Sequence, residues 1–156
     1  MDVVRLRTLP PDTEALAREA GRAGYRFLAR LLEEWRSGAN RFDGPGELLL
    51  GAMVEGRRVG VGGLNRDPYR DDPLVGRVRH LYVAESHRRQ GIGRAMLEAI
   101  AAEAAAAFRE LRLRTDQQAA AQFYECGFTP VLDATASHVM TLKGRHAGST
   151  RFSGTG

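Results

Sequence analysis

A short glycine-containing segment, Arg88-Arg89-Gln90-Gly91-Ile92-Gly93-Arg94, combines three features that suit an anionic ligand. Gly91 and Gly93 remove side chains where a ligand must approach the backbone closely. A helical pattern follows, and the first turn of a helix presents amides that have no intrahelical partner. The helix dipole adds about half a positive charge there, and arginines stand beside it. The pattern predicts a site for a pyrophosphate or a similar anion.

The glycines alone do not identify the ligand. A P-loop needs a lysine followed by serine or threonine, and the dinucleotide fingerprint needs G-x-G-x-x-G. This segment contains neither pattern. A structural interpretation therefore stays open at this point, in which Gly91 and Gly93 only ease the turn from a strand into a helix.

The elements around this segment follow from hydrophobic periodicity and turn residues. Apolar residues recur every four positions from Ile92 to Phe108, which predicts a long helix that begins within the glycine segment and ends near Phe108. A two-residue turn at Gly56-Arg57 separates the strands of an antiparallel hairpin, and a proline-containing loop follows at residues 65–75. Strands are predicted at residues 3–7, 47–55, 58–64, 78–83, 111–114, 128–131 and 138–142, and further helices at residues 12–20, 27–35 and 115–126.

The resulting order is strand, two helices, three strands, helix, strand, helix and two strands. This order predicts an α/β (α+β) fold with a mixed, mostly antiparallel sheet and flanking helices. Residues 1–143 are expected to form one domain. The remaining residues, 144–156, are rich in glycine, serine and threonine and predict a disordered tail.

Two patterns in the chain resemble the GNAT superfamily of N-acetyltransferases. The superfamily's acetyl-CoA signature, Arg/Gln-x-x-Gly-x-Gly/Ala after a strand that ends in valine, is similar to Leu81-Tyr82-Val83 followed by residues 88–93. A second pattern, Asn-x-x-Ala-x-x-x-Tyr followed by Gly-Phe, is similar to residues 117–128, with Gln117 in place of the asparagine. The order of elements is also similar, from the first strand to about Lys143.

The resemblance implies a GNAT-like fold, acetyl-CoA as co-substrate and a set of site residues. It implies that backbone groups of Leu81 and Val83 pair with the pantetheine arm, and that amides of residues 89–94 hold the pyrophosphate. It also implies that Tyr124 lies near the CoA sulfur and serves as general acid. The expected cofactor-binding residues are Leu81, Tyr82, Val83, Arg88, Arg89, Gln90, Gly91, Ile92, Gly93, Arg94 and Gln117.

The chemistry of acyl transfer gives Tyr124 a specific task. An amine that attacks a thioester must be neutral, must pass through a tetrahedral oxyanion and must expel a thiolate. A thiol has an ordinary pKa of about 8.5 and a tyrosine about 10, so a neutral Tyr124 suits donation to the departing sulfur. Gln117 and Tyr124 lie two turns apart on the predicted helix and share a face. The alternative is that Tyr124 and Phe123 are both core residues.

The proton acceptor is the least defined part of this chemistry. His80 lies on the strand before the glycine segment, and an ordinary pKa of about 6.5 suits proton uptake from an ammonium group. A purely structural histidine is the alternative. Glu85 is a second candidate, and a chain of water molecules is a third. For the oxyanion, the resemblance implies a backbone amide near Val83.

Composition excludes several classes of protein. The 156 residues, 43% hydrophobic and 27% charged, fit one soluble domain. Cys126 is the one cysteine, which excludes an internal disulfide framework and a four-cysteine zinc site, so no metal is predicted and a cytoplasmic location is expected. The densest apolar run, Leu48 to Val54, is shorter than the ~18 residues that span a bilayer, so no membrane partner is expected.

Charge gives weak support for nucleic acid as a partner. The net charge is +4, from 23 basic and 19 acidic residues, and the basic residues are spread from Arg5 to Arg151. This distribution does not predict a continuous basic face. Nothing in the sequence decides whether the chain forms a homodimer.

The combined patterns predict an N-acetyltransferase that moves an acetyl group directly from acetyl-CoA to a primary amine of a small molecule or peptide, in a ternary complex. Residues 12–41 and 131–137, where the resemblance places the acceptor, carry no motif that names it. A non-catalytic acyl-CoA-binding or sensor module is the first alternative. A nucleic-acid-binding protein, motivated by the sequence pI of 9.8, is the second.

Overall fold

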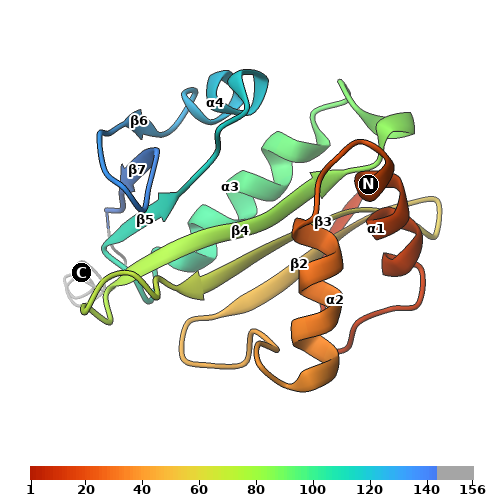
Figure 1. Cartoon of the computed structure of the whole chain (residues 1–156), viewed down its shortest axis with the longest axis horizontal. Helices are drawn as coiled ribbons and strands as arrows, with labels where there is room; N and C mark the ends of the chain where they lie inside the picture. The colour runs from red at the N-terminus through yellow and green to blue at the C-terminus, as the bar shows by residue number, and fades with distance from the viewer. Residues whose placement is uncertain (144–156) are drawn as a thin grey trace, which may run out of the picture.

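A computed structural model of the chain describes residues 1–143 and contains one seven-stranded sheet in the order β1-β2-β3-β4-β5-β7-β6 (Figure 1). The strands are β1 (Asp2–Arg5), β2 (Leu48–Val54), β3 (Arg57–Arg66), β4 (Val75–Val83), β5 (Glu110–Leu113), β6 (Thr129–Pro130) and β7 (His138–Thr141). The helices are α1 (Thr13–Arg22), α2 (Phe27–Ser37), α3 (Ile92–Ala104) and α4 (Gln118–Tyr124), with a short 3-10 turn at Glu85–His87. The predicted element order and mixed α/β class are confirmed. The predicted tail lies outside the described residues.

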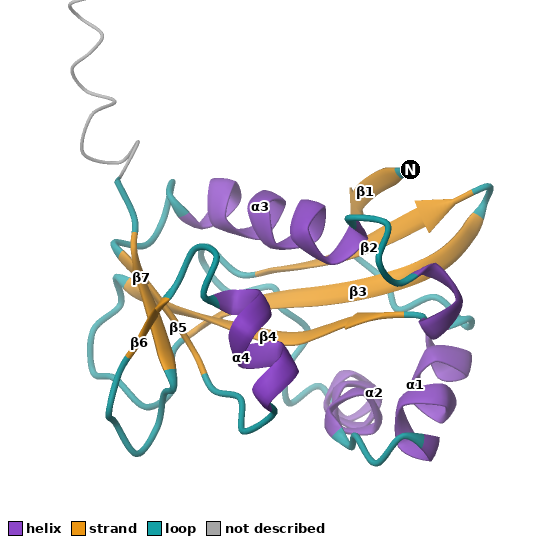
Figure 2. Cartoon of the chain, turned by 90° about the horizontal axis from the view of Figure 1, so that it is seen from above, coloured by secondary structure: helices purple, strands orange, loops and turns teal. Residues whose placement is uncertain are grey.

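Neighbouring strands of the sheet run antiparallel, except for β4 and β5, which are parallel. Figure 2 shows α3 covering one face of the sheet and α1 and α2 covering the other. The parallel pair arises because α3 carries the chain over the sheet between β4 and β5, as parallel strands require. Within residues 1–143, no helix is both long enough and apolar enough to cross a membrane.

The glycines of β3 allow close packing on both faces of the sheet. A Cβ atom at Gly60 would lie 2.9 Å from the Met96 sulfur of α3, and a Cβ at Gly63 would lie 2.6 Å from the Phe42 ring. Both separations are too short for real atoms. The absence of side chains therefore brings α3 and the segment after α2 against the sheet.

Several element boundaries differ from those predicted. The hairpin turn is Glu55-Gly56, with both residues in the left-handed region at φ +51° and +76°, so Arg57 already belongs to β3. The strand predicted at residues 78–83 begins at Val75, because Val75 to Arg77 pair with β5. Helix α3 ends at Ala104 rather than near Phe108, since Phe108 packs in the core immediately before β5.

Helix α4 is also shorter than predicted. It begins at Gln118 rather than Thr115, because the Gln117 backbone amide donates to the Thr115 Oγ1 at 3.1 Å in a local turn that replaces the first helical turn. It ends at Tyr124, where the carbonyl accepts hydrogen bonds from the amides of Gly127 and Phe128. Gln117 therefore immediately precedes the helix, and Tyr124 is its last residue.

Candidate active site

A groove opens between β4 and β5 because the two strands pair over three residues only. Val75, Gly76 and Arg77 pair with Glu110, Leu111 and Arg112, respectively. Beyond this point β5 ends at Leu113, whereas β4 continues to Val83. Among the described residues, no strand lies beside β4 on this side from residue 78 to residue 83. Such an unpaired strand edge offers backbone donors and acceptors to an extended ligand.

A bulge in β4 accompanies the divergence of the two strands. Tyr82 pairs with Val61 and Arg79 with Gly63, so β4 has one residue more than β3 over this stretch. His80, inside the bulge, has a φ of +60°, which is rare for a residue with a side chain. Bulges of this kind redirect side chains and increase the local twist of a strand.

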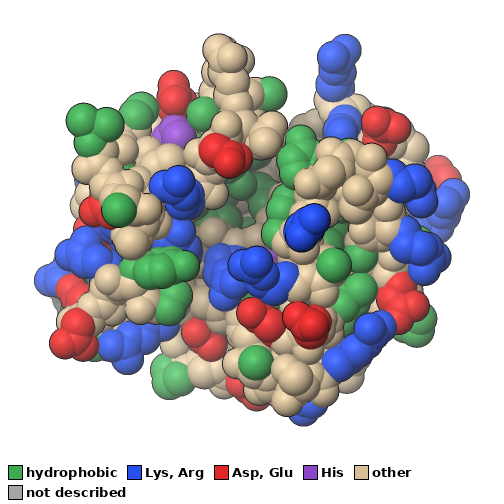
Figure 3. All heavy atoms as spheres, in the orientation of Figure 1, with side chains coloured by type: hydrophobic (Ala, Val, Ile, Leu, Met, Phe, Trp, Pro, Cys, Tyr) green, Lys and Arg blue, Asp and Glu red, His purple; other side chains and the backbone are tan. Residues whose placement is uncertain are grey.

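The groove has a volume of about 500 Å³ and two ends of different character. The first, the glycine-loop end, is lined by Leu81, Val83, Arg88, Gln117, Ala120 and Tyr124. The second, the arginine end, is lined by Arg30, Tyr69, Arg77, Arg79 and Arg114. Tyr25, Phe27, His80, Tyr82 and Asp116 are among the residues that complete the lining. Figure 3 shows the hollow near the middle of this face, with basic side chains gathered on its rim.

The glycine segment joins β4 to α3 as predicted. Gly91 is the residue before the helix and has a φ of +81°, which a residue with a side chain rarely adopts. No side chain caps α3, and the backbone amides of Ile92, Gly93 and Arg94 donate no hydrogen bond within the described residues. The helix therefore presents free donors at its positive end, the arrangement that an anion requires.

Arg88 differs from the rest of the segment because it folds back toward the groove. Its Nε donates to the Val83 carbonyl at 3.0 Å, and its guanidinium lies 5.2 Å from the centre of the Tyr82 ring. Arg89 and Arg94 are exposed and form no ion pair with the described residues. These two arginines leave their positive charges available beside the start of α3.

Tyr124 projects from the end of α4 into the groove. Its ring packs against Phe123, Phe128 and His138, with centroid separations of 5.2, 5.9 and 6.4 Å. Its hydroxyl has no hydrogen-bond partner among the described residues. Burial raises the pKa of Tyr124 to about 12, so the phenol keeps its proton at neutral pH. A protonated, unpartnered hydroxyl in a groove is suited to donate a proton or a hydrogen bond.

His80 lies at the floor of the groove, and its ring contacts Phe27 and Phe42 at centroid separations of 6.4 and 6.0 Å. It is more than nine-tenths buried, and both ring nitrogens are enclosed, without a side-chain hydrogen-bond partner among the described residues. Burial, together with the positive charges of Arg79 and Arg30, lowers the pKa of His80 to about 3. The ring is therefore neutral, but such a low pKa does not suit the proton uptake expected of this residue.

Two neighbouring residues have roles that the sequence does not reveal. The Tyr82 hydroxyl donates to the Glu19 carboxylate on α1, and burial and this bond raise the pKa of Tyr82 to about 12. Its side chain is thereby engaged with α1, and its backbone pairs with Val61 of β3. Glu85, the second candidate base, is exposed and lies outside the groove lining, and its backbone amide donates to Glu19 at 3.0 Å.

Residues of the arginine end were not predicted as site residues. They come from α2, the loop between β3 and β4, β4 itself and the loop after β5. Apart from Arg77 and Arg79, which share β4, each lies in its own segment, so only the topology brings them together. Cys126 is exposed, and no group of three or more potential metal ligands occurs within residues 1–143.

Comparisons with known proteins place this geometry in a family. A family model described as the acetyltransferase (GNAT) family matches residues 12–128. A solved structure from Exiguobacterium sp. 255-15, provisionally described as an acetyltransferase, is 26% identical, with a TM-score of 0.77 and 99% of both chains covered. An acetyltransferase of the GNAT family from Staphylococcus aureus Mu50 is 16% identical, with a TM-score of 0.67, and the match covers 91% of this chain and 100% of that chain.

A further solved structure is that of N-acetylglutamate synthase from Neisseria gonorrhoeae complexed with coenzyme A and N-acetyl-glutamate. It is 17% identical, with a TM-score of 0.66, and the match covers 92% of this chain and 36% of that chain. No curated protein sequence matches the chain.

The fold and the family model define an acyltransferase of mixed α/β architecture. The chain belongs to the GNAT acetyltransferase family, whose members use acetyl-CoA and act on amine acceptors in general. The family predicted from the two sequence patterns is thus confirmed.

Proposed function

We propose that residues 1–143 form one N-acyltransferase domain that moves an acetyl group from acetyl-CoA directly to a primary amine of a small molecule or peptide. One observation carries the proposal: an unpaired strand edge and an unpartnered tyrosine hydroxyl line one end of one groove, and a helix start with free amides follows the same strand just outside the groove lining. A thioester with a long polar arm and a pyrophosphate needs these three features together. The composition and single cysteine support a cytoplasmic location.

The hydrogen-bonding groups at the glycine-loop end match those of acetyl-CoA. The backbone of Leu81 and Val83 has no strand beside it and suits the amide groups of pantetheine. The free amides of residues 92–94, with Arg89 and Arg94 beside them, suit the pyrophosphate. Gln117 lines the same end of the groove, and its side-chain amide is available to the pantetheine arm.

The proposed reaction needs no covalent enzyme intermediate. The amine nitrogen attacks the thioester carbon, and a backbone N–H of β4 near Val83 stabilises the oxyanion that forms. The C–S bond then breaks, Tyr124 donates its proton to the departing sulfur, and the new amide nitrogen gives up its proton to solvent. The products are an N-acetylated amine and coenzyme A, with Tyr124 reprotonated from solvent.

His80 has a modified role in this proposal. Because its pKa is about 3, the ring does not remove a proton from the ammonium form of the amine. Both ring nitrogens are buried, and the neutral ring forms part of the groove floor between Phe27 and Phe42. The ammonium proton leaves to water, the third route considered from the sequence.

The test is a calorimetric titration with acetyl-CoA, beside coenzyme A and ATP, followed by a thiol-release assay over a panel of primary amines. Saturable binding of acetyl-CoA and amine-dependent thiol release are expected. Binding without release from any amine would favour a non-catalytic acyl-CoA-binding module instead. Failure of both acetyl-CoA and coenzyme A to bind would overturn the proposal.

A further inference from the structure

We propose that the amine acceptor carries a carboxylate group, which binds at the arginine end of the groove with Arg30 as its principal contact. This inference rests on the proposed function, because it assigns the acceptor to the half of the groove that the cofactor leaves open. It follows from the charges, positions and partners of the residues that line this end.

The lining of the groove has a strong excess of positive charge. Five arginines line it, at positions 30, 77, 79, 88 and 114, whereas Asp116 is the one acidic residue in the described lining. Acidic side chains outside the lining offset part of this charge. Asp67 lies 3.3 Å from Arg77, and Glu34 lies 3.9 Å from Arg79. The excess positive charge therefore lies on the lining arginines that have no such carboxylate nearby.

Arg30 and Arg114 carry the unbalanced charge at the arginine end. Neither has a carboxylate within 4 Å among the described residues, and Arg114 donates to the neutral Ala134 carbonyl at 3.2 Å. Arg79 has one carboxylate, that of Glu34, at the limit of an ion pair. An anion entering the groove thus meets guanidinium groups whose charge no internal partner has neutralised.

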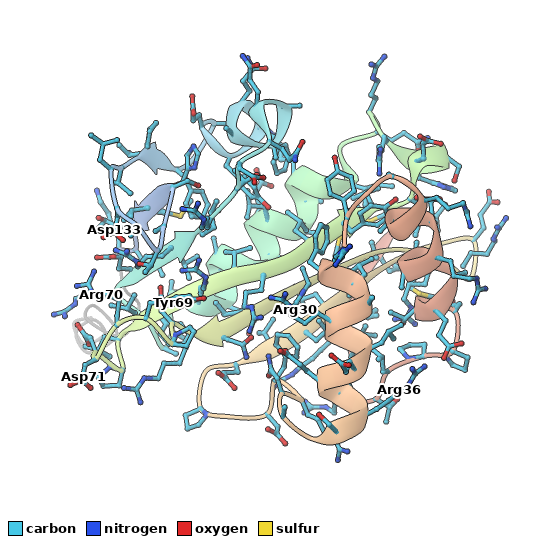
Figure 4. All side chains as sticks on the ribbon, in the orientation of Figure 1. Arg30, Arg36, Tyr69, Arg70, Asp71 and Asp133 are labelled. Carbon is cyan, nitrogen blue, oxygen red and sulfur yellow. The ribbon has the colours of Figure 1, made fainter. Side chains whose placement is uncertain are left out.

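These arginines converge from different elements. Figure 4 shows Arg30 on one side of α2, the side toward Tyr69, whereas Arg36 of the same helix lies on the opposite side. Arg36 pairs there with Glu14. The two arginines of α2 therefore differ in one respect that matters: Arg30 lines the groove without a partner, and Arg36 is paired outside it.

The floor of the groove supports the same interpretation. His80 is more than nine-tenths buried and lines the same groove as Arg30 and Arg79. Burial is the main cause of its lowered pKa, and the charges of Arg79 and Arg30 add to it. The positive charges of these arginines therefore act at the floor of the groove, beside the end that the cofactor leaves open.

This field selects the acceptor and also prepares it. A purely cationic amine is repelled by unpaired guanidinium groups, whereas a carboxylate accepts two parallel hydrogen bonds from one of them. The same field lowers the pKa of the acceptor's ammonium group, because like charges disfavour the charged form. A larger fraction of the bound amine is then neutral and nucleophilic, which removes part of the need for a strong protein base.

The phosphates of the cofactor do not account for these arginines. The free amides of α3, with Arg89 and Arg94, lie beyond Val83 at the glycine-loop end, whereas Arg77 and Arg79 lie at the start and middle of β4. A groove of about 500 Å³ suits a small molecule once the pantetheine arm has entered. A small amino-carboxylate is therefore the acceptor that the charges and the space favour.

The test compares primary amines in matched pairs, each a free amino acid and its carboxamide: glycine with glycinamide, phenylalanine with phenylalaninamide, and glutamate with glutamine. The thiol-release assay gives kcat/KM for each compound. The carboxylate member of at least one pair is expected to exceed the carboxamide by about tenfold or more, as expected for a charged hydrogen bond. Arg30→Gln is expected to abolish this ratio, and Arg36→Gln, which removes the same charge from the same helix, is expected to preserve it.

A second readout separates this inference from the proposed function. Coenzyme A is bound first, and N-acetylated amino acids and their amides are then titrated calorimetrically into the complex. Tighter binding of the acids, lost in Arg30→Gln, supports the inference. A preference for carboxamides or diamines, no binding of the acids to the coenzyme A complex, or a ratio unchanged by Arg30→Gln would overturn it while leaving the cofactor site intact. Failure of coenzyme A itself to bind would instead overturn the proposed function.

Discussion

The two ends of the groove are constructed in different ways. The glycine-loop end uses backbone groups from one continuous stretch, the end of β4 and the start of α3, together with Tyr124. The arginine end uses side chains from four separate segments and almost no backbone. Backbone donors suit a ligand part common to many reactions, whereas side chains are free to vary with the acceptor. The contrast assigns the general step of the chemistry to one end and the specificity to the other.

The largest expected effect is on stability, at the buried ion pairs that hold the arginine end in place. Asp67 is buried and lies 3.3 Å from both Arg77 and Arg112. Asp67→Asn removes the charge partner of the buried Arg77 and one of the three carboxylate partners of the buried Arg112, and should lower the free energy of unfolding by about 3 kcal/mol. Urea denaturation measures this change. Asp133→Asn removes an exposed partner of the same Arg112 and should have a much smaller effect, so equal losses in both variants would contradict the prediction.

Tyr124→Phe should affect the chemical step most. Removing the hydroxyl deletes the proposed acid and should lower kcat by about 100-fold, within the range for general acid catalysis. Affinity for acetyl-CoA should change little, since the ring keeps its contacts with Phe123 and Phe128. Thiol release and calorimetry measure the two quantities separately. A variant with normal kcat would show that Tyr124 is only a packing residue.

The glycines of the loop provide a matched pair at the cofactor site. Gly91 has a φ of +81°, so Gly91→Ala strains the backbone before α3 and should weaken acetyl-CoA binding by about tenfold. A Cβ at Gly93 would meet Phe123 at 3.5 Å and Val83 at 3.7 Å, which are ordinary contacts. Gly93→Ala should therefore have the smaller effect in the same titration. The reverse order would show that close approach, rather than backbone conformation, sets the requirement for glycine.

The pH dependence of the free energy of unfolding tests the lowered pKa of His80, at the groove floor between the two ends. The pKa of His80 is about 3 in the folded chain and about 6.5 when unfolded, so the unfolded ring binds a proton first as the pH falls. The His80 contribution is fully present above pH 6.5 and is lost below it, by about 1 kcal/mol between pH 6.5 and 5.5.

His80→Gln should remove this slope, and His87→Gln should keep it. Urea denaturation across that interval measures both variants. The carboxylates of Glu19, Asp72 and Asp133 have lowered pKa values and titrate below this window. A slope that persists in His80→Gln would show that another group is responsible.

The sequence predicted the glycine-loop end far better than the arginine end. The glycine segment and the periodic helix after it are local features, so spacing alone located both. Arg30, Arg79 and Arg114 are isolated charges in separate segments, and the order of strands in the sheet is what brings them together. The bulge at His80 had no signal either, because a positive φ is uncommon for any residue other than glycine and a single histidine does not predict it.

Boundary errors have similar physical reasons. Val75 to Arg77 were predicted to lie outside the strand, but their partner is β5, more than thirty residues away in the chain. The start of α4 was placed three residues early because the Thr115 side chain satisfies the Gln117 amide in a turn instead of capping a helix. In both cases the competing interaction is absent from the local pattern.

The open edge of β4 also bears on association between chains. A strand with unpaired backbone groups at the outside of a sheet is a template for pairing with another molecule, and leads to aggregation. Here the unpaired stretch lies inside the sheet, with β3 on one side and the wall of the groove on the other. The protein can thus keep a vacant hydrogen-bonding edge without the risk that accompanies an exposed one.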